Sequence, residues 1–211
     1  MRPFPNKKYN IIYADPPWRY KDKSLSQGGG AESHYPTMDV DDICALPVAS
    51  ITAKNCTLFL WATMPMLLFE APKVITAWGF EYKTCAFVWV KTNKRTNPKQ
   101  LVMLPDEVFA IDEFLGMGWW TRSNAELCLL AVRGKPKRVS ANVRQIIYAP
   151  VREHSRKPAE TRARIVKLMG NLPRIELFAR HTAPGWDAWG NEVGKLYAGQ
   201  QQLFVKGATH P

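Results

Sequence analysis

The sequence predicts an α/β fold in which helices cover both faces of a mostly parallel, twisted sheet. Short apolar runs rich in β-branched and aromatic residues alternate along the chain with helical segments, which is the pattern of such sheets. The chain has 211 residues, of which 46% are hydrophobic and 22% charged. This length and composition fit a single catalytic domain, which we expect at residues 1–193, followed by a polar C-terminal tail at residues 194–211.

The first predicted strand, residues 9–14, ends directly before Asp15-Pro16-Pro17-Trp18. A glycine-rich segment at residues 19–38 follows, in the usual place for a flexible lid beside a site. The strand puts the Asp15 carboxylate at its carboxyl end, the edge where open α/β sheets bind ligands. We therefore expect the ligand site at this edge.

The remaining elements continue the alternation. Helices, bounded by capping residues, glycine or proline, are predicted at residues 40–46, 66–78 and 159–169. Asp39 is the expected cap of the first of these, and Pro72 is expected to kink or break the second. Strands are predicted at the aromatic and β-branched runs 57–61, 82–91, 126–132, 145–148 and 174–179. Residues 92–118 form a second predicted flexible loop for the target, with an acidic amphipathic helix at residues 105–115.

The tetrapeptide after the first strand combines three features that suit an exocyclic amino group on a flat heterocycle. Asp15 supplies an acidic acceptor. The prolines Pro16 and Pro17 fix the backbone and leave carbonyl oxygens free to accept hydrogen bonds. Trp18 offers a flat surface for stacking. On these four residues alone, a rigid turn with a core tryptophan remains the alternative.

The chain is strongly basic, with 29 lysines and arginines against 18 acidic residues and a formal net charge of +11. Such an excess favours a polyanionic partner, most simply nucleic acid. Residues 133–164 hold ten basic residues and two acidic ones. We expect the first four basic residues of this run to track a phosphate backbone, with a solvated face as the alternative: Arg133, Lys135, Lys137 and Arg138.

Other classes of protein lack their usual signals here. The four cysteines are far apart without a C-x-x-C pair, which predicts free thiols in a reducing cytosol. The four histidines have no metal-ligand spacing, so we expect no metal site. The usual phosphate-binding, dinucleotide-binding and serine-hydrolase loops are missing. No signal peptide or stretch long enough to span a bilayer stands out, so we expect a cytoplasmic protein with no membrane contact.

Nine motifs stand in a fixed order from about Tyr9 to Val193, and together they resemble one known family. They are Asp15-Pro16-Pro17-Trp18, Tyr35-Pro36-Thr37-Met38, Leu58-Phe59-Leu60-Trp61, Trp78-Gly79-Phe80, Val88-Trp89-Val90-Lys91-Thr92-Asn93, Glu126-Leu127-Cys128-Leu129 with Arg133-Gly134, Lys157-Pro158, Ile175-Glu176-Leu177-Phe178-Ala179-Arg180 and Gly190-Asn191-Glu192. The resemblance is to the MT-A70 family, that of the catalytic subunit of the eukaryotic mRNA N6-adenosine methyltransferase, with bacterial and phage relatives.

The resemblance implies a Rossmann-like methyltransferase with a circularly permuted motif order. It would use S-adenosylmethionine to methylate the 6-amino group of adenine in nucleic acid, by direct in-line transfer after the base is flipped out. The implied catalytic residues are Asp15, Pro16, Pro17 and Trp18. Substrate contacts would come from Tyr35, Lys157 and Trp18. The implied cofactor-binding residues are Asp15, Lys157, Glu176, Phe178, Arg180, Asn191 and Glu192.

Within this class we favour a site-specific, adenine-N6 DNA methyltransferase, because the chain is a bare catalytic core without an RNA-binding module. An RNA N6-adenosine methyltransferase is the runner-up. A different class is a catalytically silent, nucleic-acid-binding partner subunit. Such subunits typically lose the D-P-P-W motif and the cofactor residues, whereas Asp15, Lys157, Asn191 and Glu192 all stand here. A monomer and a homodimer both fit the sequence.

Overall fold

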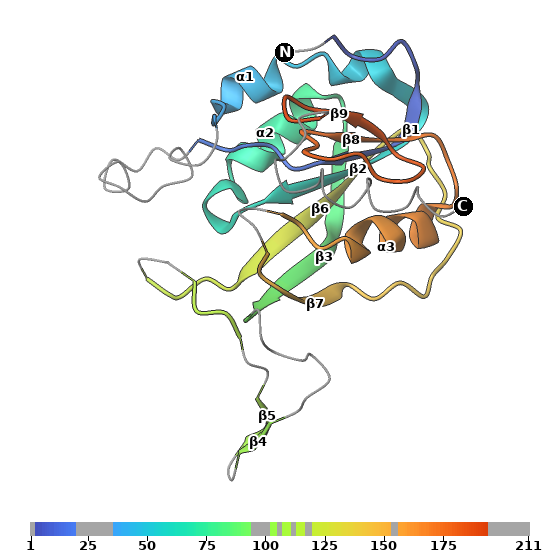
Figure 1. The fold of residues 1–211 in the computed structure, drawn as a ribbon. Helices are drawn as coiled ribbons and strands as arrows, with labels where there is room; N and C mark the ends of the chain where they lie inside the picture. The colour runs from blue at the N-terminus through green and yellow to red at the C-terminus, as the bar shows by residue number, and fades with distance from the viewer. Residues whose placement is uncertain are drawn as a thin grey trace, which may run out of the picture.

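The computed structural model describes residues 3–19, 36–93, 102–104, 107–110, 113–116, 120–152 and 156–193. Within these ranges one sheet holds seven strands in the order β7-β3-β6-β2-β1-β8-β9 (Figure 1). Every neighbouring pair is parallel except the two pairs that β6 makes with β2 and β3. Six strands therefore run one way and β6 the other, so the prediction of a mostly parallel sheet is confirmed.

The strands follow the predicted order closely, with one addition. They are β1 (Tyr9–Ala14), β2 (Thr52–Ala62), β3 (Glu81–Thr92), β6 (Ala125–Arg133), β7 (Ile146–Pro150), β8 (Arg174–Leu177) and β9 (Asp187–Trp189). The helices are α1 (Val40–Cys44), α2 (Glu70–Ala77) and α3 (Glu160–Met169), with 3-10 turns η3 (Val48–Ile51) and η4 (Met64–Met66). The sequence did not predict β9, because three residues are too short for a recognisable alternation.

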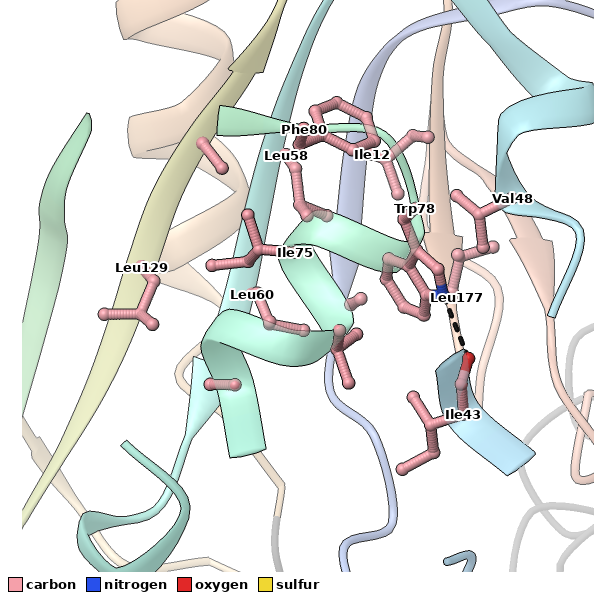
Figure 2. Packing of buried hydrophobic residues seen from close by; sticks show 14 of the residues in the cluster. Ile12, Ile43, Val48, Leu58, Leu60, Ile75, Trp78, Phe80, Leu129 and Leu177 are labelled. Carbon is pink, nitrogen blue, oxygen red and sulfur yellow. Dashed lines mark hydrogen bonds between the residues drawn. The ribbon is translucent and has the colours of Figure 1, made fainter. Parts of the chain in front are cut away.

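Helices cover both faces of the sheet, as predicted. Alternate residues of each strand point to opposite faces, so Ile12 belongs to one buried cluster and Ile11 to the other. Figure 2 shows the first cluster, in which Ile75 and Trp78 pack over the strands and the Trp78 indole donates to the Ile43 carbonyl at 2.9 Å. The second cluster includes Ile165 of α3. No helix in the described ranges is long and apolar enough to cross a membrane.

Three local predictions need correction. The second helix begins at Glu70 and not at Met66, so Pro72 lies in its first turn, where no backbone donor is needed, and not at a kink or break inside a longer helix. Asp39 occupies the N-cap position of α1 as predicted, but its side chain makes no capping hydrogen bond, and its carboxylate instead accepts a hydrogen bond from Arg19 at 2.5 Å. The helix predicted at residues 105–115 is wrong.

That segment contains a strand, β5 (Glu107–Ala110), which pairs with β4 (Val102–Leu104) in an antiparallel ribbon. The sequence between them is Pro105-Asp106, a dipeptide typical of turns that the helical prediction did not take into account. Most of the two predicted flexible loops and the whole C-terminal tail lie outside the described residues. The ends of the first loop meet, because Trp18 and Met38 form a parallel bridge.

Candidate active site

Charged residues from distant parts of the chain meet at the carboxyl edge of the sheet. Asp15 follows β1, the strand between β2 and β8. Glu126 is the second residue of β6 and comes to the same edge because β6 runs antiparallel: its neighbour Leu127 pairs with Ala62, the last residue of β2. Lys157 lies just ahead of α3. The site predicted beside Asp15 is therefore a cluster of buried charges.

Lys157 is the centre of this cluster. Its Nζ atom lies 2.8 and 2.9 Å from the two carboxylate oxygens of Asp15, and 3.1 Å from Oε2 of Glu126. Lys91 Nζ lies 2.6 Å from the other Glu126 oxygen. The Lys157 side chain is only 7% exposed, and its ammonium lies 5.6 Å from the centroid of the Trp61 ring. The four side chains form a row of alternating charge, Lys91, Glu126, Lys157 and Asp15.

Burial and ion pairing compete in setting the protonation of this row. Burial raises the pKa of Glu126, but Lys157 and Lys91 outweigh it and bring the pKa down to about 2. Burial lowers the pKa of Lys157, while Asp15 and Glu126 more than reverse this and raise it. For Asp15, burial dominates and raises the pKa, with Lys157 opposing it. Asp15, whose side chain is 26% exposed, is thus the more basic of the two carboxylates and the one open to a ligand.

The tetrapeptide itself is a rigid turn. The Pro16 carbonyl accepts the Trp18 backbone N–H at 2.9 Å, and the Pro17 carbonyl accepts that of Met38 at 2.8 Å. A carbonyl oxygen has two lone pairs, so Pro16 keeps one for a ligand. Trp18 is 5% exposed and belongs to the hydrophobic core, with its indole N–H donating to the Trp61 carbonyl at 3.1 Å. This burial argues against the stacking role predicted for Trp18 and favours its anchoring the turn.

A second ion pair lies at the end of β8. Glu176 accepts two hydrogen bonds from Arg162 of α3, at 2.5 and 2.8 Å. The Arg162 guanidinium also lies 6.0 Å from the centroid of the Tyr13 ring, and the Tyr13 hydroxyl accepts the Trp61 indole N–H at 2.7 Å. Arg162 therefore fixes the orientation of the Glu176 carboxylate.

The segments after β8 and β9 lie against each other. Phe178 has a left-handed backbone with φ of 60°, and its ring packs edge-on against Trp189 at 5.7 Å between centroids. A Cβ on Gly190 would lie 2.3 Å from the Ala179 carbonyl oxygen, so only glycine allows this approach. Beyond it, Arg180 Nε lies 3.6 Å from a Glu192 oxygen. Asn191 is exposed at the same edge.

Nearly the whole described part of the chain matches the model of one known family. The model of the MT-A70 family matches residues 9–192. The chain belongs to the MT-A70 family. The family resemblance of the nine motifs is thereby confirmed, and membership of a methyltransferase family implies a methyl donor.

The MT-A70 relatives fall into two groups by coverage. The type II methyltransferase M.MunI of Mycoplasma sp is 37% identical over 207 residues, which cover 90% of this chain and 79% of the relative. An MT-A70-like N(6)-adenosine-methyltransferase of Arabidopsis thaliana is 30% identical over 188 residues, 88% of this chain and 24% of the relative. The human N(6)-adenosine-methyltransferase catalytic subunit METTL3 is 27% identical over 193 residues, 90% of this chain and 29% of the relative. The chain thus spans less than a third of these two eukaryotic proteins.

Not all of the predicted site residues meet at this edge. Tyr35 lies outside the described residues. Arg133 ends β6, and seven residue steps of strand place it roughly 23 Å from Glu126, at the opposite edge of the sheet. Beyond it, the Val139 N–H donates to the Leu168 carbonyl near the far end of α3. This placement argues against the predicted backbone contacts beside the target base by Arg133, Lys135, Lys137 and Arg138.

Three charged residues of the MT-A70 site were missing from the sequence prediction of the site. Glu126 and Lys91 lie within predicted strands, and a charge in an otherwise apolar strand is a signal that could have pointed to them. Arg162 had no such signal, because an arginine on an amphipathic helix is usually solvated. Among the described residues no cluster of His, Cys, Asp and Glu suited to a metal ion is found.

Proposed function

We propose that the protein is an S-adenosylmethionine-dependent methyltransferase that modifies the 6-amino group of adenine in nucleic acid, with DNA as the substrate. The observation that carries this proposal is the Asp15 carboxylate, which Lys157 holds by both oxygens beside the Pro16 carbonyl at the ligand edge of the sheet. Membership of the MT-A70 family and the names of the relatives support it.

The chemistry required of the site is activation of a poor nucleophile. The lone pair of the adenine amine is delocalised into the ring. An Asp15 oxygen and the free lone pair of the Pro16 carbonyl accept its two hydrogens, which draws the nitrogen towards sp³ geometry and directs its lone pair. S-adenosylmethionine supplies an electrophilic methyl group on a sulfonium. Positioning and charge complementarity do the rest, without a covalent enzyme intermediate.

Asp15 also suits the proton balance of the reaction. A new N–CH₃ bond forms as the S–CH₃ bond breaks, and the nitrogen must then lose one proton. The pKa of Asp15, raised by burial, makes this carboxylate a better proton acceptor than an exposed aspartate. Lys157 keeps it anionic beforehand, and the Glu126 and Lys91 pair keeps Lys157 in place.

The described residues fit such a cofactor in charge and position. Its amino-acid end needs both cationic and anionic partners, and its ribose needs hydrogen-bond acceptors. Lys157 and Arg180 are cations at the edge, and Glu176 is an anion held by Arg162. Asn191 and Glu192 supply acceptors for the ribose hydroxyls in the segment after β9. Phe178 acts through its backbone turn, because its ring packs against Trp189.

DNA is the proposed substrate because of how the relatives align. M.MunI, named a type II methyltransferase, matches over 79% of its own length, whereas the two N(6)-adenosine-methyltransferases match over 24% and 29%. RNA methylation is the second candidate and is favoured by the names of those two relatives. The silent partner subunit is disfavoured by the intact ion pair between Asp15 and Lys157.

The test is Asp15→Asn, with Asp187→Asn as the matched control. Each of the two carboxylates has an oxygen 2.8 Å from a lysine Nζ atom, Lys157 for Asp15 and Lys7 for Asp187. Asp187, however, begins β9 at the opposite edge of the sheet. Labelled S-adenosylmethionine is incubated with duplex DNA, single-stranded DNA or RNA, and the nucleosides are analysed by mass spectrometry. We expect N6-methyladenine from the parent and the control, and at least a hundredfold slower transfer by Asp15→Asn, judged folded by circular dichroism. Undiminished transfer by folded Asp15→Asn would refute the role of Asp15.

A further inference from the structure

Because Trp18 is only 5% exposed, its ring offers little surface on which an unpaired base could stack. Among the large hydrophobic residues that the structure describes, Trp120 is the most exposed, at 93%. A tryptophan exposes far more apolar surface than most residues, so full exposure in a folded chain favours a binding role. Trp120 is therefore the candidate for this aromatic surface.

Trp120 begins the segment of residues 120–124, and the last residue of this segment, Asn124, is hydrogen-bonded to a residue at the active-site edge. The Asn124 carbonyl accepts the backbone N–H of Lys91 at 2.8 Å, and Phe114 N–H donates to the Lys91 carbonyl at 2.9 Å. A Cβ on Gly116 would lie 1.7 Å from the Ser123 carbonyl oxygen, so the backbone at Gly116 is in close contact with the backbone at Ser123.

The length of the connecting chain limits how far Trp120 lies from the active-site edge. Asn124 lies four residue steps after Trp120, and four extended steps span at most about 14 Å. Asn124 directly precedes β6, whose second residue is Glu126, the partner of Lys157. Figure 1 shows the segment ahead of β6, in yellow-green, on the same side of the sheet as the chain that follows β2. The chain length thus keeps Trp120 within about 14 Å of Asn124, a distance from which a side chain reaches nucleotides that flank a bound target.

The charge beside Trp120 indicates the kind of partner. Arg122 is exposed and forms no ion pair with any residue that the structure describes. An exposed aromatic ring beside an unpaired arginine is the combination by which proteins stack on unpaired bases and contact the adjoining phosphate. An apolar protein partner would be matched poorly by this arginine.

We propose that Trp120 stacks on a nucleobase beside the target adenine and that Arg122 contacts the neighbouring phosphate. This inference rests on the proposed function, since it takes nucleic acid as the substrate. The role differs from the one that the sequence suggested for Trp18, because the base that Trp120 contacts is a neighbour of the target and not the target adenine itself.

The test compares Trp120→Ala with Trp120→Phe, and uses Tyr82→Ala as the control. Tyr82 is also an exposed aromatic residue, at 51%, but it is the second residue of β3 and lies at the opposite edge. Binding of a fluorescent single-stranded DNA oligonucleotide containing adenine is measured by anisotropy. We expect Trp120→Ala to weaken binding roughly tenfold, and Trp120→Phe and Tyr82→Ala to bind within about twofold of the parent. Arg122→Ala should reduce the slope of log affinity against log salt by about 0.7.

Two outcomes would overturn the proposal. One is unchanged oligonucleotide affinity in Trp120→Ala. The other is a change of oligomeric state in that variant, measured by analytical ultracentrifugation, which would assign Trp120 to a contact between copies of the chain. Cofactor affinity, measured by calorimetry, should be equal in all variants. Because binding is measured without turnover, failure of the stacking proposal is distinguishable from failure of the methyltransferase proposal, which would show as no transfer by the parent.

Discussion

Glu126→Gln tests the buried row of charges most directly. Glu126 has an 11% exposed side chain and separates two lysines, with oxygens 2.6 Å from Lys91 and 3.1 Å from Lys157. The substitution keeps the shape of the side chain and removes its charge. Lys91 then has no carboxylate at this position, and Lys157 keeps only Asp15. Breaking a buried pair on one side is strongly destabilising, because it leaves a charge uncompensated.

The magnitude follows from the pKa of Glu126. Its fall from an ordinary 4.5 to about 2 corresponds to about 3 kcal/mol of stability at neutral pH, at 1.36 kcal/mol per pKa unit. For a chain of this size, that loss lowers the thermal midpoint by roughly 6–12 °C. Because the folded-state pKa is the lower one, the contribution is complete above pH 4.5 and disappears as the pH falls towards 2.

The assay is urea denaturation of Glu126→Gln and the parent at pH values from about 7 down to about 3, with Glu160→Gln as the control. Glu160 also pairs with a basic residue, Arg164 at 2.8 Å, but its side chain is 52% exposed, so its loss should cost under about 1 kcal/mol. The gap between Glu126→Gln and the parent should be widest near neutral pH and narrow in acid. Equal stabilities at neutral pH, or a gap that does not change with pH, would refute the reasoning.

Two further predictions concern binding. Arg162→Ala should weaken S-adenosylmethionine binding about tenfold in calorimetry, because it removes both hydrogen bonds that orient Glu176. Arg162→Lys should recover part of this loss. Equal affinity in the parent and both variants would exclude the orienting role. The double variant Arg152→Ala, Arg156→Ala should weaken DNA binding and flatten its salt dependence, because Arg152 follows β7 and Arg156 precedes Lys157 at the active-site edge. Lys135→Ala, Lys137→Ala removes the same charge at the opposite edge and should change DNA binding much less; the reverse ranking would restore the surface predicted from the sequence.

The strands were predictable because each depends on a local pattern. The run that becomes β1 is apolar except for Asn10, as expected of a strand covered on both faces, and its predicted bounds match the observed ones. Segments whose structure depends on few local signals were harder. The turn sequence at Pro105-Asp106 competes with helical periodicity, and β9 has only three residues, held by pairing with β8.

The tetrapeptide Asp15-Pro16-Pro17-Trp18 likewise has features that the sequence predicts and one that only the structure shows. Its position at the carboxyl end of the first strand follows from the sequence, and so does the choice of Asp15 as an acceptor. The accessibility of Trp18 does not, because a tryptophan after two prolines fits a stacking surface as well as a core residue. Only the packed structure shows its indole N–H donating to the Trp61 carbonyl, 43 residues away.

By itself, the sequence determined the order of six strands of the large sheet and of the three helices, the edge at which the site lies, and a set of motifs specific enough to identify the MT-A70 family. The tertiary structure decided which charges meet there. Lys157 reaches Asp15 across 142 residues of chain, and the antiparallel course of β6 brings Glu126 to the active-site edge while carrying Arg133 away from it. Local patterns set the conformation of a segment, whereas the direction of its neighbours in the sheet sets which of its ends faces the substrate.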